Sequence, residues 1–153
     1  MVDKVKQIET EHLSFSYPGG NAALRDVTLS VEPGEFVTLC GLSGCGKSTL
    51  LRLLKPGIQP RGEAGGRILL NGRELPKEPD SYTSSALGFV MQDPEAQTVT
   101  DKVWHELAFS CESVGLPRGE IRRRVGEMAC YFGLEELFGR DTSTLSGGQK
   151  QLL

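Results

Sequence analysis

Strand patterns dominate the first 91 residues of the chain, where apolar and polar side chains alternate with a period of about two. The β-strands predicted from alternation or from short apolar runs cover residues 8–17, 24–31, 36–40, 65–70 and 87–91. Two of these, 36–40 and 87–91, are continuous apolar runs, which are typical of strands buried inside a parallel sheet. The Asn71-Gly72 pair after the fourth strand is a strong signal for a hairpin turn.

In two regions the apolar spacing changes to the three- and four-residue steps of helices. Residues 48–55 form the first region, and Pro56-Gly57 would end that helix. Residues 99–140 show the spacing twice, in the sets Val103, Leu107, Cys111, Val114 and Ile121, Val125, Met128, Phe132. We therefore expect an α/β protein in which a block of short helices is set apart from the strands.

Composition adds several limits. With 153 residues, of which 38% are hydrophobic and 24% charged, the chain has the size and composition of one globular domain. Its net charge of −3 offers no general attraction to nucleic acid or anionic lipid, so we expect no nucleic-acid partner. The four cysteines lack zinc-like spacing and are expected to be free thiols in a reducing cytoplasm. Because the longest apolar runs are strand-sized, a role at a membrane would need a membrane-spanning partner.

Residues 41–48, Gly-Leu-Ser-Gly-Cys-Gly-Lys-Ser, match the phosphate-loop pattern G-x-x-x-x-G-K-[ST]. They lie between a predicted strand and a predicted helix, and this context disfavours a glycine-rich turn with a chance lysine. Glycines allow successive backbone N–H groups to point at an anion, and the start of the helix adds its positive dipole end. Lys47 is suited to reach the β- and γ-phosphates of a nucleotide, and the Ser48 hydroxyl to bind Mg²⁺. The residues expected to hold the nucleotide here are Gly41, Ser43, Gly44, Cys45, Gly46, Lys47, Ser48 and Thr49.

A second motif, Leu145-Ser-Gly-Gly-Gln-Lys-Gln151, begins about 100 residues after the phosphate loop. Ser146 is a good helix N-cap, and the two glycines that follow it would make the helix start a second anion site. On its own the motif is equally compatible with an ordinary capped helix. Together with the phosphate loop, it resembles the LSGGQ signature of ABC-transporter ATP-binding cassettes. The nucleotide-binding residues that this resemblance implies are Ser146, Gly147, Gly148 and Gln149.

The resemblance covers nearly the whole chain and implies a P-loop NTPase core with an antiparallel β lobe and an α-helical subdomain. It implies residues 1–35 for the start of the β lobe and 36–92 for the P-loop core with the Q-loop strand. The helical subdomain would cover 93–145, and the signature motif with its helix start 145–153.

Two further site residues follow from the resemblance. Tyr17 is similar to the aromatic residue that stacks on adenine; a core tyrosine is the alternative, and Phe15 is the rival ring on the same strand face. Gln92 is similar to the Q-loop glutamine, which in the family contacts Mg²⁺ or the attacking water and senses the membrane partner. Lys47 and Gln92 are thus the expected catalytic residues, and Ser48 and Gln92 the expected metal ligands.

The resemblance also implies parts that would follow residue 153. These are the strand that ends in Asp-Glu, the D-loop, the switch histidine, and the strands that flank 36–40 in the family's sheet. We therefore expect these 153 residues to be a C-terminally truncated cassette that lacks the C-terminal core strands. Such a chain would bind nucleotide at most and would not hydrolyse ATP by itself.

For the intact protein the resemblance implies MgATP binding, head-to-tail pairing with a second cassette, and hydrolysis that drives an integral membrane permease. The cassette would lie in the cytoplasm, held on the inner face of the membrane by the permease. Residues 92–99 and Glu106 are most similar to energy-coupling-factor cassettes for vitamins, cobalt or nickel. Two other classes stay open: a nucleotide-dependent interaction module without hydrolysis, and a soluble ABC ATPase of DNA repair or translation. The acidic net charge favours transport over the latter.

Overall fold

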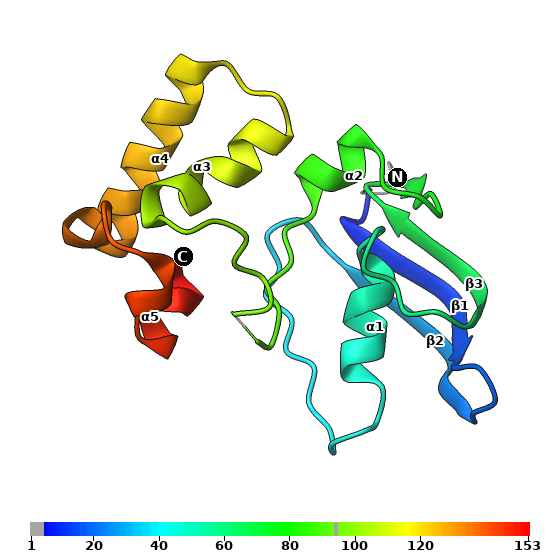
Figure 1. Ribbon diagram of the computed structural model, residues 1–153. Helices are drawn as coiled ribbons and strands as arrows, with labels where there is room; N and C mark the ends of the chain where they lie inside the picture. The colour runs from blue at the N-terminus through cyan, green and yellow to red at the C-terminus, as the bar shows by residue number, and fades with distance from the viewer. Residues whose placement is uncertain (1–4, 94) are drawn as a thin grey trace. The chain divides into compact units, whose positions relative to one another are not determined.

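The computed structural model describes residues 5–93 and 95–153 of the chain. The chain forms two compact units, one up to Leu87 and one from Gly88 to Leu153 (Figure 1).

The first unit is built on a four-stranded antiparallel sheet in the order β2-β1-β3-β4. Its strands are β1 (Ile8–Ser16), β2 (Ala22–Val31), β3 (Glu63–Leu70) and β4 (Arg73–Glu74). The predicted strands at 8–17, 24–31 and 65–70 are confirmed. So is the hairpin turn, in which Asn71 and Gly72 take φ angles of 51° and 76°, because a tight turn between twisted strands requires positive φ at both positions.

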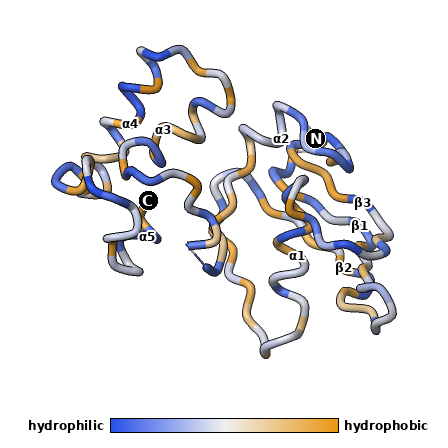
Figure 2. Tube along the Cα trace, viewed as in Figure 1, coloured by the Kyte–Doolittle hydropathy of each residue, from blue (hydrophilic) through white to orange (hydrophobic). Residues whose placement is uncertain are grey.

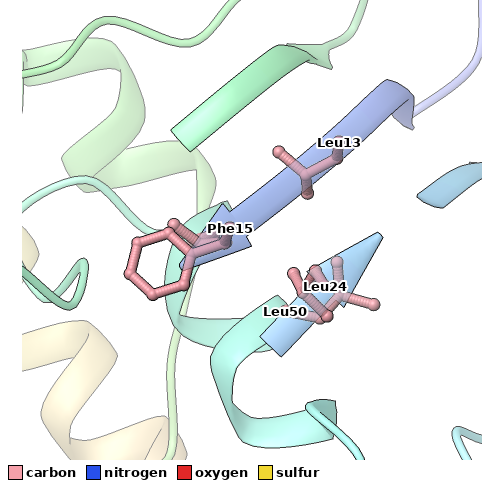
Figure 3. Close-up of a cluster of buried hydrophobic side chains, with 5 residues drawn as sticks. Leu13, Phe15, Leu24 and Leu50 are labelled. Atoms are coloured by element: carbon pink, nitrogen blue, oxygen red, sulfur yellow. The ribbon is translucent and has the colours of Figure 1, made fainter. Parts of the chain in front are cut away.

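A single apolar cluster joins helix α1 (Lys47–Leu54) to this sheet. Leu13 and Phe15 from β1 and Leu24 from β2 are buried against Leu50 and Leu53 of the helix (Figure 3). Burying a side chain of this size contributes roughly 1.5–3 kcal/mol relative to leaving it exposed. The cluster therefore fixes the start of α1, and with it the phosphate loop, beside β2. The helix predicted over 48–55 is confirmed.

The predicted strands at 36–40 and 87–91 are wrong for the structure of this chain. Neither segment forms a helix or a strand, and neither belongs to the sheet of the described residues. Residues 36–40 form a hydrophobic stretch outside any helix or strand (Figure 2). The Phe36 side chain is 93% exposed. A parallel strand is stable only when neighbouring strands form hydrogen bonds with its backbone N–H and C=O groups. No such neighbour exists within residues 5–93 and 95–153.

Helix α2 (Ser81–Ala86) closes the first unit. Its N-terminus is capped by Asp80, whose carboxylate accepts a hydrogen bond from the backbone N–H of Thr83. At its C-terminus the Lys55 ammonium donates to the carbonyl oxygens of Thr83, Ser84 and Leu87. A lysine at this end complements the helix dipole and ties α1 to α2.

The second unit is helical. Its elements are α3 (Val103–Ser113), α4 (Arg118–Phe132), two short 3₁₀ turns, η1 (Glu135–Leu137) and η2 (Thr142–Thr144), and α5 (Gly147–Leu152). Helices α3 and α4 pack against each other (Figure 1). Val103 of α3 and Val125 of α4 are buried. The block of helices predicted over 99–140 is confirmed. None of the helices in the described part of the chain combines the length and apolar character needed to cross a membrane.

Candidate functional site

The phosphate loop is held open by glycines in conformations that other residues rarely adopt. Gly41, Gly44 and Gly46 have φ angles of 154°, 82° and 98°. Gly46 is also confined by backbone, since a Cβ placed there would lie 2.6 Å from the Ala23 carbonyl oxygen and 2.9 Å from the Leu24 side chain. A Cβ at Gly41 would lie 2.8 Å from the Cys45 sulfur, which is a side-chain atom. This close approach to β2 is what allows α1 to begin directly beside the sheet.

Replacing Gly46 with alanine is expected to destabilise the first unit by roughly 2–4 kcal/mol, because left-handed strain adds to a clash with backbone that cannot move away. Gly44→Ala is the matched control, since Gly44 has a similar φ but open space around it, and should cost only about 1–2 kcal/mol. Urea unfolding followed by circular dichroism gives both values. Equal losses in the two variants would show that contact with β2 does not constrain the loop.

Lys47 supplies the positive charge of the loop. Its ammonium donates hydrogen bonds of 2.8 Å to the carbonyl oxygens of Gly41 and Leu42 and lies 3.5 Å from the Cys45 sulfur. The side chain therefore folds back over the exposed loop. An anion bound there would meet the ammonium together with backbone N–H groups, a combination suited to phosphate. The neighbouring Ser48 side chain is exposed, as a hydroxyl that is to bind a cation must be.

The structure separates the two aromatic candidates of β1. Phe15 is only 2% exposed and belongs to the core, whereas Tyr17 is 41% exposed just beyond the end of the strand. The two rings pack edge to face with centroids 5.0 Å apart. The Tyr17 hydroxyl shares a hydrogen bond of 3.0 Å with the Thr49 hydroxyl in α1. An accessible aromatic ring therefore lies close to the phosphate loop, and Phe15 is unsuitable as a stacking surface.

Ser146 caps helix α5, as predicted. Its hydroxyl accepts from the Gln149 N–H at 3.3 Å, and the Gln149 side-chain oxygen accepts from the Ser146 N–H at 2.9 Å. In this capping box the side-chain oxygen of Gln149 is engaged by the Ser146 N–H at the start of the helix. Gly147 and Gly148 are exposed, with open space where a Cβ would lie. The first turn of α5 is therefore not covered by side chains at Gly147 and Gly148, and it is accessible to an anion.

The turn that precedes α5 is anchored to the start of α3. The buried Thr142 hydroxyl donates to the Thr100 carbonyl oxygen at 2.9 Å, and Lys102 forms a 2.8 Å ion pair with Asp141. Leu145 is buried directly before the cap. These contacts fix the position of Ser146 within the second unit.

Gln92 is exposed in the loop that begins the second unit. The residues that organise this loop were not predicted from the sequence. The Gln97 amide bonds the backbone of Phe89 and Met91, and Glu95 pairs with Lys150. No sequence signal identifies such partners, because side-chain-to-backbone bonds depend on where the loop folds.

Two charged features have structural roles. The Glu106 carboxylate accepts hydrogen bonds from the backbone N–H groups of Val99 and Thr100. On α4, hydrogen bonds from Arg123 and Arg124 hold the pKa of Glu120 down to about 2. Arg123 also pairs with Glu127, so much of the positive charge of this helix is already compensated.

The structure distributes the predicted site residues over the two units. Tyr17 and residues 41–49 lie together in the first unit, and Gln92 and residues 146–149 belong to the second. No group of three or more His, Cys, Asp or Glu side chains that could hold a metal ion occurs among residues 5–93 and 95–153.

Known proteins resemble this chain in sequence and in fold. A family described as "ABC transporter" matches residues 24–153. An ABC transporter ATP-binding protein of Bacillus cereus is 43% identical over 99% of this chain and 28% of its own length. One from Methanosarcina acetivorans is 42% identical over 97% of this chain and 25% of its own length.

Among solved structures, cbiO1 from Clostridium perfringens, described as part of the ABC transporter complex cbiONQ, superposes with a TM-score of 0.79 at 29% identity. The ATP-binding subunit of an ABC transporter gives a TM-score of 0.77, also at 29% identity. The matches cover 96% and 95% of this chain and 58% of each solved chain. The chain thus spans about a quarter of the curated relatives and somewhat more than half of the solved ones.

Proposed function

This chain belongs to the ABC transporter family, and on that premise we propose that it supplies the phosphate loop and the signature helix of an ATP-binding cassette that binds MgATP. The observation that carries the proposal is the joint placement of Tyr17, Thr49 and the glycine loop with Lys47 in one unit. These residues offer an aromatic face, backbone N–H groups and a cation at the start of one helix, which are the groups that a nucleoside triphosphate requires.

Each part of the nucleotide has a proposed partner in the chain. Tyr17 stacks on the adenine ring, and residues 41–49 surround the phosphates. Lys47 exchanges its bonds to the Gly41 and Leu42 carbonyl oxygens for bonds to phosphate oxygens, which are stronger because both partners are charged. Ser48 and Gln92 hold Mg²⁺, which neutralises charge on the phosphates during hydrolysis.

The bare helix start at Ser146, Gly147 and Gly148 is proposed to bind the γ-phosphate of a nucleotide held by a second cassette. A chain with two anion sites, one in each of its compact units, is suited to head-to-tail pairing, in which each nucleotide is enclosed by both subunits. The similarity to cbiO1, described as part of an ABC transporter complex, supports a role as the ATPase of an energy-coupling-factor importer. We infer that membrane permease subunits hold the cassette on the cytoplasmic face of the membrane.

Residues 1–153 alone are expected to release no phosphate from ATP above background. Hydrolysis needs a group that orients the attacking water. Two candidate carboxylates that follow Gln92 in the sequence are already engaged: Glu106 binds the Val99 and Thr100 N–H groups, and Glu95 pairs with Lys150. A phosphate-release assay on this chain and its Lys47→Ala variant measures the effect. Lys47-dependent turnover on the order of 1 s⁻¹ would contradict the assignment of the catalytic residues.

A further inference from the structure

The segment that leads to Gln92 is held by a side chain instead of a neighbouring strand. The Gln97 side-chain nitrogen donates to the Phe89 carbonyl oxygen at 2.8 Å, and its oxygen accepts from the Met91 N–H at 2.8 Å. One carboxamide thus makes the pair of hydrogen bonds that a strand would make. The bond to Met91 fixes the residue directly before Gln92, so Gln97 closes the base of the loop that carries Gln92.

The same loop is joined to helix α5 by an ion pair. Glu95 lies between Gln92 and Gln97, and its carboxylate contacts the Lys150 ammonium. The Lys150 side chain is only 13% exposed, whereas that of Glu95 is 72% exposed. A largely buried ammonium depends on its partner more than an exposed one does, because removing the partner leaves a desolvated charge. Lys150 lies in the last turn of the short helix α5, whose N-cap is Ser146.

We propose that Gln97, Glu95 and Lys150 form a positioning unit that sets the Gln92 loop and couples it to the signature helix. The inference rests on the proposed function, in which Gln92 serves the nucleotide of its own cassette and Ser146 that of the partner cassette. Through the Glu95–Lys150 pair, a displacement of the Gln92 loop is transmitted to the start of α5. The occupancy of one nucleotide site thereby biases the geometry of the other.

Charge exchange tests the ion pair. In a full-length cassette that contains this chain, Glu95→Lys and Lys150→Glu are each expected to lower kcat about tenfold while MgATP affinity changes less than about twofold. The double exchange should restore kcat to within about threefold of wild type, because the pair is re-formed with reversed charge. Single variants with wild-type kcat, or a double exchange without rescue, would overturn the coupling.

We call the two hydrogen bonds from the Gln97 side chain to Phe89 and Met91 the Gln97 clamp. A measurement without nucleotide tests this clamp. Gln97→Ala is expected to speed hydrogen exchange of the Met91 amide at least about tenfold, since its acceptor is lost. Gln97→Glu keeps an acceptor oxygen and should preserve most of the protection. Unchanged Met91 exchange in Gln97→Ala would overturn the clamp. If wild type fails to bind MgATP while the Met91 result holds, the proposed function fails and the clamp stands as a feature of the fold.

Discussion

Lys47→Ala in a full-length cassette that contains this chain is expected to abolish measurable MgATP binding. The Lys47 ammonium is the cation of the phosphate loop, and it already lies 2.8 Å from two carbonyl oxygens at the loop's rim. Losing a charge-assisted phosphate contact in an enclosed site costs roughly 2–5 kcal/mol, which corresponds to a loss of affinity of about 30- to 5,000-fold. Isothermal titration with MgATP measures the change.

Arg52→Ala is the matched control for this prediction. Arg52 lies on the same helix, is exposed, and carries the same charge, but it belongs to the last turn of α1 and not to the loop. Its removal should change affinity by less than about threefold, because an exposed charge at a distance is screened. Unchanged affinity in Lys47→Ala, or equal losses in both variants, would remove the basis for assigning a nucleotide site to this loop.

Local signals account for the elements that the sequence predicted correctly. The alternation over 8–17 and 24–31, the Asn71-Gly72 turn and the Ser146 cap each depend on a few adjacent residues. Backbone sterics and short-range hydrogen bonds decide such features, so they can be recognised without knowledge of the rest of the fold.

Local signals do not decide the structure of the segments 36–40 and 87–91, which were predicted as strands. An apolar run indicates burial, but only neighbouring strands turn it into a strand, and the described residues provide none. Phe36 is therefore exposed, while Phe89 and Met91 are bonded by the Gln97 side chain. Likewise, the alternation of side chains along β1 places Phe15 and Tyr17 on the same strand face. It therefore could not predict that one of them is buried and the other exposed. The difference arises because β1 ends at Ser16, so that Tyr17 leaves the sheet.

The composition of the candidate site was predictable, but its internal contacts were not. The pattern around Lys47 specifies residue types that suit phosphate, whereas the Tyr17–Thr49 hydrogen bond joins residues 32 positions apart and requires α1 to pack on β1 and β2. Long-range contacts of this kind depend on tertiary packing, which no local window of sequence contains.

Ser146→Arg in the full-length cassette is expected to abolish ATP-dependent dimerisation and turnover while leaving the ATP affinity of the monomer nearly unchanged. Ser146 belongs to the second compact unit, and the nucleotide site of the same chain is proposed in the first. The long arginine side chain would cover the bare first turn at Gly147 and Gly148, where open space now surrounds each glycine. Light scattering with and without MgATP measures the dimer, and titration measures the affinity.

Ser146→Ala separates this steric effect from loss of the helix cap. Both variants lose the hydroxyl that accepts from the Gln149 N–H, which costs about 1 kcal/mol and frays the start of α5. Only arginine adds bulk to the first turn. We therefore expect Ser146→Ala to weaken the ATP-dependent dimer partially and Ser146→Arg to eliminate it. An ATP-dependent dimer of wild-type strength in Ser146→Arg would mean that this helix start does not meet the nucleotide of a second cassette.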